Sequence, residues 1–222
     1  MKFHRMKTIL LLTAMALSST ASANDNFWVG VKAGTLGFGI EGAWRPIEWL
    51  DVRAGGNFYD YDATETQAGI TYDATLALET FYVTGNFRFP LSPFRLTAGA
   101  FSNGNEVRMV SQPAASYDLG NSIGYLPAEV GSLQSVTSFD GVSPYVGAGF
   151  DFEIMNRLGL SLDFGVLLQG EPTVSLTSDG ALALIEDPGF LADLQAESSQ
   201  LQNELKDLKA YPVVSIGFNF NF

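Results

Sequence analysis

Tyr211-Pro-Val-Val-Ser-Ile-Gly-Phe-Asn-Phe-Asn-Phe222 is a stretch in which apolar and small polar residues alternate. Successive side chains of a β-strand point to opposite faces, so a period of two assigns these residues to two faces. One face is apolar throughout and carries Pro212, Val214, Ile216, Phe218, Phe220 and Phe222. The other face is mostly small and polar and carries Val213, Ser215, Gly217, Asn219 and Asn221. An apolar face toward lipid and a polar face toward a lumen are typical of a transmembrane β-barrel.

Seven further segments show the same alternation, at about 27–34, 36–41, 49–59, 74–89, 94–103, 143–154 and 158–168. A soluble barrel or sandwich with an apolar core would produce a similar pattern. Glycine decides against that alternative, because it recurs on the polar faces, where it leaves room in a narrow lumen. The sequence therefore predicts an all-β fold: a transmembrane, antiparallel, up-and-down β-barrel of eight strands.

The connections between these segments differ in length, which predicts the orientation of the barrel. Residues 45–48, 90–93 and 155–157 are short turns, and 60–73, 104–142 and 169–210 are long loops. Outer-membrane barrels have short periplasmic turns and longer extracellular loops. Aromatic residues gather near the short turns, where an interfacial girdle is expected. A further hairpin within 104–142 would instead give ten strands and a wider lumen.

Residues 1–23 have the pattern of a secretory signal peptide. Basic residues precede the apolar run Ile9–Leu17, and Ala21-Ser-Ala23 is a small-x-small cleavage site. We expect cleavage after Ala23, a barrel domain over 24–222, and residence in the cell outer membrane.

Cleavage would restrict the available chemistry. His4 is the only histidine, and the chain has no cysteine, so the mature protein would lack both residue types. Histidine-assisted and thiolate mechanisms are then impossible, and we predict that the protein is not an enzyme and needs no cofactor or metal. Loss of Lys2, Arg5 and Lys7 from 12 basic residues leaves nine against 24 acidic ones. That balance excludes a nucleic-acid partner.

In architecture the chain resembles the small eight-stranded Gram-negative outer-membrane barrels, the group of the OmpA transmembrane domain, OmpX and OmpW. The resemblance covers 24–222 and includes the signal, the alternation, the turn and loop asymmetry, and the aromatic last strand. It implies a monomer in contact with outer-membrane lipid and lipopolysaccharide. It also implies that the assembly machinery reads the last strand, here through Tyr211, Phe218, Phe220 and Phe222.

Charged residues fall on the lumenal parity of several strands. The cations are Lys32, Arg53, Arg88 and Arg95, and the anions are Glu41, Asp151, Glu153 and Asp163. An eight-stranded barrel has an interior just wide enough for side chains to fill it, so charges there must pair. We therefore predict a lumen packed by ion pairs and a structural, envelope-integrity or surface-recognition role. The alternative is a narrow channel for ions or small solutes, gated by the long loops.

Residues 188–209 are predicted to form the one clear helix of the chain. This helix is amphipathic and is inserted in the last extracellular loop. Asp187 can cap it, Pro188 suits its first turn, and Leu191, Leu194, Leu201, Leu205 and Leu208 recur at heptad-like spacing. Packing on the 104–142 loop, binding of a protein partner, and a lid over the barrel are the three interpretations. Asp60, Asp62, Glu65 and Asp73 in the 60–73 loop are expected to be solvated, with a Ca²⁺ or lipopolysaccharide contact as the alternative.

Overall fold

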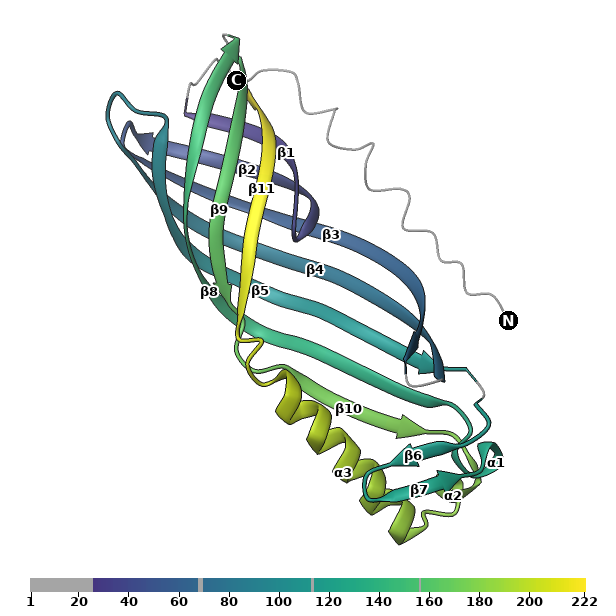
Figure 1. The fold of residues 1–222 in the computed structure, drawn as a ribbon. Coiled ribbons are helices and arrows are strands. Elements are labelled where there is room, and N and C mark those ends of the chain that lie inside the picture. Colours follow the sequence, from purple (N-terminus) through teal and green to yellow (C-terminus); the bar gives the residue numbers. More distant parts are fainter. Residues whose placement is uncertain (1–25, 68–69, 113, 156) are drawn as a thin grey trace.

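The structure is a computed structural model, and it describes residues 26–67, 70–112, 114–155 and 157–222. The expected signal peptide, 1–23, lies outside the described residues. Within them a barrel is built from β1 (Phe27–Gly34), β2 (Gly37–Ile47), β3 (Leu50–Gln67), β4 (Ile70–Arg88), β5 (Phe94–Ser111), β8 (Leu133–Met155), β9 (Leu158–Leu168) and β11 (Ala210–Asn221). Each strand pairs antiparallel with the next, and β11 pairs with β1 to close the barrel (Figure 1). The prediction of eight strands is confirmed, and 104–142 adds no strand pair to the barrel.

The closing seam shows how the alternation produces the two faces. Val31 lies opposite Phe218 and Gly30 opposite Asn219, so residues of one kind meet across the seam. Phe218 is 57% exposed on the outside, whereas Asn219 is buried inside. At this seam apolar side chains therefore cover the outer wall and polar ones face the lumen, as the sequence predicted.

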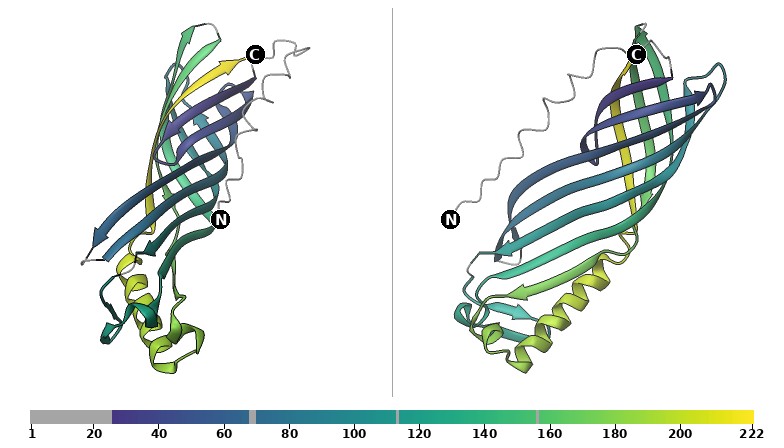
Figure 2. Two further views of the ribbon diagram at one scale, coloured as in Figure 1. Left: turned by 90° about the vertical axis from the view of Figure 1, so that its right-hand side faces the viewer. Right: turned by 180° about the vertical axis from the view of Figure 1, so that it is seen from behind.

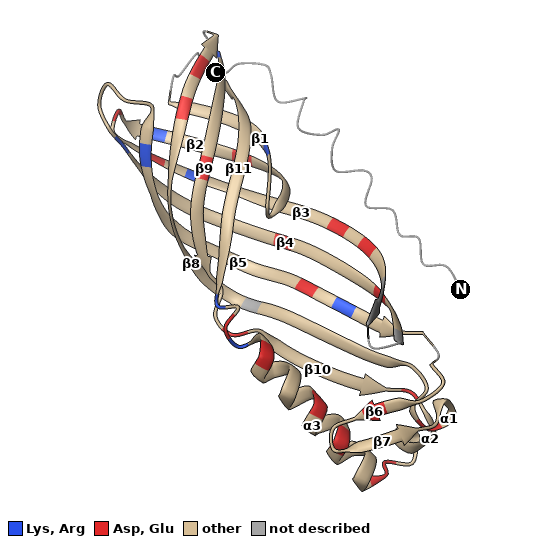
Figure 3. Ribbon diagram, viewed as in Figure 1, with Lys and Arg blue, Asp and Glu red and all other residues tan. Residues whose placement is uncertain are grey.

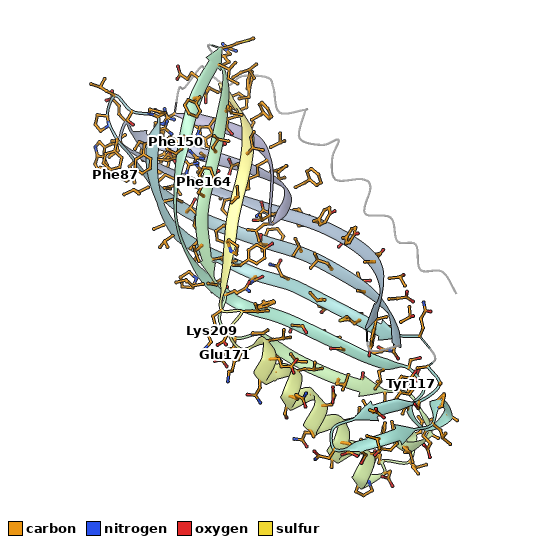
Figure 4. The ribbon with its side chains drawn as sticks, viewed as in Figure 1. Phe87, Tyr117, Phe150, Phe164, Glu171 and Lys209 are labelled. Carbon is orange, nitrogen blue, oxygen red and sulfur yellow. The ribbon has the colours of Figure 1, made fainter. Side chains whose placement is uncertain are left out.

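An aromatic belt surrounds the short-turn end of the barrel. Its rings contact one another from strand to strand, at centroid distances of 5.1 to 6.3 Å between Trp49, Phe87, Phe89, Phe94, Phe150 and Phe152. Phe87 marks this end in Figure 4, and the C-terminal strand ends there too. Belts of aromatic side chains are typical of the level at which a membrane meets water.

The barrel wall is much taller on one side than on the other. β1 and β2 meet at a tight turn after Gly34, but β3, β4, β5 and β8 continue well past that level (Figure 2). β10 (Thr173–Ser178) pairs with the start of β8 and widens this extension. We call the extended parts of β3, β4, β5, β8 and β10 the projecting sheet. The expectation of loops at 60–73 and over all of 104–142 is therefore wrong, because most of these residues continue the strands.

The two faces exchange character in the projecting sheet. Along β4, Phe81 and Val83 point outward from the barrel, but further along the same outer face come Glu79, Ala77 and Thr75. The inner face changes from Thr84 and Thr80 to Leu78 and Leu76. The apolar outer wall of the barrel therefore ends near Glu79.

A small domain packs at the far end of the projecting sheet. It contains the hairpin β6 (Tyr117–Leu119) and β7 (Ser122–Tyr125), the short helices α1 (Pro127–Val130) and α2 (Ala181–Leu184), and α3 (Pro188–Leu205). Its core consists of Tyr117, Leu119, Val130, Leu133, Phe190 and Leu194. Figure 4 marks Tyr117 at this end of the molecule. No helix in the described part of the chain is long and apolar enough to cross a membrane.

The helix in the last long connection differs in detail from the prediction. It ends at Leu205 rather than at residue 209. Asp187 caps it by accepting a hydrogen bond from the Phe190 amide at 2.9 Å. Of the leucines at heptad-like spacing only Leu194 is buried, and Leu208 lies beyond the helix and is exposed. Its anchors are Phe190 and Leu194, which supports local packing and not a coiled-coil seam.

Candidate functional site

Asp151 is the centre of the charged network in the lumen. Its carboxylate accepts hydrogen bonds from Arg53 Nη2 at 2.9 Å, from Arg95 Nε at 3.1 Å, and from Arg88 Nη1. These three arginines come from β3, β5 and β4, so one carboxylate on β8 ties four strands together. Charge-assisted hydrogen bonds of this kind are roughly twice as strong as neutral ones.

A second carboxylate completes the network from the opposite wall. Asp51 is fully buried and accepts from Arg53 Nε at 3.2 Å, from Arg88 Nη1 at 3.1 Å and from the Asn86 amide. Asp51 shares the lumenal parity of Arg53 but was not among the predicted lumenal charges. Its position two residues before Arg53 was the signal that could have identified it.

The remaining lumenal charges form smaller groups. Arg95 is 1% exposed and also binds Asp163. Lys32 Nζ lies 3.6 Å from Glu41, and Glu41 accepts a hydrogen bond from the Tyr82 hydroxyl. These contacts bring together seven of the eight charged residues named from the sequence, as part of one lumenal filling.

Glu153 lies apart from that filling. It is exposed at the short-turn end, where β8 ends at Met155. Strand parity alone put it inside, but the lumen no longer encloses a side chain so close to the end of the strand.

Above the charges, an aromatic layer fills the lumen at the level of the tight β1–β2 turn. It consists of Leu36, Tyr82, Phe101, Tyr145, Leu167 and Val213, with Tyr211 packed against it. Phe101 stacks on Tyr82 at a centroid distance of 4.8 Å and packs at a tilt against Tyr145 at 5.0 Å. Leu36 shares the parity of the outward-facing Phe38 and Ile40, but the tight turn directs it inward, where it is 4% exposed. The lumen therefore contains two filled layers, one ionic and one aromatic.

Glycines on the strands make room for the large lumenal side chains. A Cβ atom at Gly55 would lie 2.6 Å from the Tyr82 hydroxyl oxygen, and one at Gly149 would lie 2.7 Å from Arg95 Cζ. A Cβ atom at Gly165 would collide with the Tyr145 hydroxyl group. The glycines therefore allow a narrow barrel to hold rings and guanidinium groups.

The residues expected to form an assembly signal divide between two positions on β11. Phe218 and Phe220 face outward, and the ring of Phe220 packs edge to face against that of Phe222 at 5.6 Å. Tyr211 lies at the other end of the strand, where its hydroxyl donates to the Thr35 carbonyl at 2.6 Å.

The two edges of the projecting sheet differ in what lies beside their backbone. At β10, the Gln202 side chain of α3 accepts from the Val174 amide at 2.9 Å and donates to the Pro172 carbonyl. The Ser198 hydroxyl donates to the Val174 carbonyl at 3.2 Å. Side chains of α3 therefore satisfy the backbone of this edge.

At the opposite edge, β3 pairs with β2 only as far as Phe58 but continues beside β4 to Gln67. Within the described residues, this part of β3 has a strand on one side only. Tyr59 and Tyr61 stack on one face of the edge at 6.4 Å, and Asp60 and Asp62 are exposed on the other. Acidic residues are visible on this part of β3 in Figure 3.

Hydrogen bonds to two carboxylates of α3 link this helix to the β6–β7 hairpin of the small domain. Asp193 of α3 accepts from the Tyr125 hydroxyl at 2.7 Å and from the Asn121 amide at 3.3 Å, and Glu197 accepts from the Gly120 amide at 3.1 Å. The pKa of the Asp193 carboxyl is lowered mainly by a hydrogen bond with the Ser122 side chain, and further by those from Tyr125 and Asn121.

A second exposed contact links the two ends of the last long connection. Lys209 Nζ lies 2.7 Å from Glu171, at the position labelled in Figure 4. The ammonium group lowers the pKa of Glu171 through this hydrogen bond.

Comparison with solved structures matches the architecture. The chain is similar to CarO2 of Acinetobacter baumannii, with a TM-score of 0.60 and 21% identity over 88% of this chain and 98% of that one. The chain has the fold of a small outer-membrane β-barrel. CarO of the same organism gives a TM-score of 0.57 and 22% identity, over 88% of this chain and 97% of that one. At these identities the likeness extends to the fold alone. No family model and no curated protein matches the sequence of this small barrel.

Proposed function

We propose that this protein is a non-conducting barrel of the bacterial outer membrane that presents a recognition surface to the outside of the cell. The apolar outer wall and the aromatic belt support residence in a bilayer. The short-turn end would face the periplasm and the projecting sheet the exterior. The lipid-facing wall would end near Glu79, where the outer face of β4 becomes polar.

The filled lumen favours this role over that of a channel. An ion crossing the barrel would have to separate Asp151 from three arginines and then displace the stacked rings of Tyr82, Phe101 and Tyr145. Separating one partner from a buried ion pair costs about 3–5 kcal/mol.

The β3 edge is the observation that carries the recognition role. Unpaired strand edges are normally blocked because they recruit other strands. This molecule blocks the β10 edge with Gln202 and Ser198, while the β3 edge beyond Phe58 stays open within the described residues. Asp60 and Asp62 would repel a second copy of the same edge and attract a basic one. The partner we infer is an extended protein segment with basic residues at alternate positions, which adds a strand to β3.

Two measurements test the proposal. The refolded protein, checked by the heat-dependent shift of its gel mobility, should give no conductance steps in a planar bilayer. Reproducible open steps would contradict the closed lumen and favour the channel.

For the edge, the probe is a synthetic peptide of alternating lysine and valine. It should bind, while an alternating glutamate and valine peptide and a version with alternate N-methylated amides should not. The double variant Asp60→Lys/Asp62→Lys should reverse the charge preference. Glu204→Lys/Asp207→Lys, at exposed positions in the last turn of α3 and just beyond it, should not. Binding that ignores N-methylation would show that strand addition is not involved.

A further inference from the structure

A cavity of about 450 Å³ lies at the short-turn end of the barrel, below the charged network. Its buried wall includes Trp28, Arg45, Arg53, Arg88, Asp151 and Asn219. Residues 91–93 and the exposed Glu153 also line it. The ionic and aromatic layers separate it from the projecting sheet. It is therefore a blind pocket that opens toward the side on which the short turns lie.

The charges around this pocket do not balance. Asp151 and Asp51 are already shared among Arg53, Arg88 and Arg95. With Asp163, the described part of the lumen offers three carboxylates to these arginines and Arg45. Lys32 and Glu41 pair with each other, Arg53 Nη1 also lies 4.0 Å from Glu41, and Glu153 lines the exposed rim of the cavity. Around the buried part of the cavity wall, the four arginines therefore exceed the three aspartates by one.

Three buried polar atoms on the cavity wall also have no hydrogen-bond partner among the described residues. They are Arg45 Nε, Arg53 Nη1 and Asn219 Oδ1. Arg53 is 3% exposed. Its Nη1 forms an ion pair with Glu41 Oε1 at 4.0 Å, which is longer than a hydrogen bond and leaves both atoms without a hydrogen-bond partner among the described residues. Its orientation is fixed because its guanidinium lies over the Trp28 ring, 4.6 Å from the centroid. A buried donor without an acceptor costs about 1–3 kcal/mol, so Arg45 Nε and Arg53 Nη1, both on the wall of the cavity, would each be stabilised by an added acceptor.

We infer that this pocket binds a small oxyanion, a phosphate or carboxylate group, between Arg45 and Arg53. A guanidinium group presents its donors in a fork that matches such anions, and the excess positive charge would be neutralised. The volume also admits a small organic body attached to the anion. Asn219 Oδ1 would then accept a hydrogen bond from a hydroxyl or amino group on that body.

The test is calorimetric titration of the refolded full-length barrel with inorganic phosphate and, separately, with acetate. A non-ionic detergent and a phosphate-free buffer are required, because phosphocholine detergents carry the chemistry under test. We expect saturable binding that weakens about tenfold or more, or about 1.4 kcal/mol, in Arg45→Gln. Arg45→Lys, which keeps the charge, should recover part of the affinity.

The matched control is Arg157→Gln, since Arg157 is an exposed arginine in another short turn, outside the cavity. It should bind like the wild type. A Trp44→Phe/Trp49→Phe background leaves Trp28 as the only tryptophan of the chain. Its emission, excited at 295 nm to avoid tyrosine, should change on binding because the Arg53 guanidinium lies over its ring.

Three outcomes would overturn the inference: no saturable binding, equal weakening in Arg45→Gln and Arg157→Gln, or unchanged binding in Arg45→Gln. A short-chain phosphatidylglycerol that displaces phosphate would identify a lipid headgroup as the source of the anion. Failure to displace it would identify a soluble one.

Discussion

At the scale of single residues, the two carboxylates near the end of β8 differ in role although they share a parity. Asp151 binds three arginines, whereas Glu153 is exposed. Asp151→Asn would leave Arg53, Arg88 and Arg95 without their shared anion. We expect a loss of about 3–5 kcal/mol in the free energy of unfolding, because an uncompensated buried charge is costly. Urea unfolding in detergent, followed by tryptophan fluorescence, measures this loss.

Glu153→Gln is the control for Asp151→Asn, since it removes an acid of the same strand and the same parity. It should change the unfolding free energy by less than about 0.5 kcal/mol. If the two variants were equally stable, the three arginines would not depend on Asp151.

At the scale of secondary-structure elements, side chains of α3 cover the β10 edge of the projecting sheet. Gln202 contacts the Val174 amide and the Pro172 carbonyl, so Gln202→Ala removes both contacts at once. We expect the β10 edge to open, with faster hydrogen exchange at Val174 and a loss of about 1–3 kcal/mol of local stability. Asn203→Ala is the control because its side chain bonds only within the helix, to Ser199, and it should leave Val174 protected.

The contact of α3 with the β6–β7 hairpin should depend on pH. Hydrogen bonds lower the pKa of Asp193 in the folded protein, so its contribution to stability is complete above the ordinary aspartate value of about 3.9. The contribution is lost as the pH falls through the lowered value. Exchange at the Asn121 amide, which donates to Asp193, should therefore rise only below about pH 4. In Asp193→Asn the exchange should be fast already at neutral pH, and in Asp207→Asn it should match the wild type.

The barrel strands were predictable from the sequence, whereas the projecting sheet and the aromatic layer were not. The eight strands and the lumenal parity followed from the period of two, because lipid and lumen impose opposite chemistry on neighbouring residues. The projecting sheet did not follow. From Tyr59 to Asp62 the tyrosines fall on the inner face of β3 and the aspartates on the outer face. Because apolar residues were expected on the outer face, this reversal resembled the end of the strand. The aromatic layer was missed for a related reason, since Tyr82 and Tyr145 fall on a parity that was expected to be polar.

At the scale of the whole molecule, the exchange of faces along β4 predicts how far the lipid reaches. Val83 and Ala77 lie on the same outer face of one strand, on either side of Glu79. Arginine in place of a lipid-facing residue costs about 2–4 kcal/mol near the bilayer midplane and about 0–1 near the interface. Val83→Arg should therefore lower the unfolding free energy in lipid vesicles, whereas Ala77→Arg should leave it nearly unchanged. Folding of both variants in detergent and then in vesicles separates the effect of the bilayer from that of the strand. Equal losses for the two variants in vesicles would place Ala77 in lipid too, and the projecting sheet would then be part of the membrane wall.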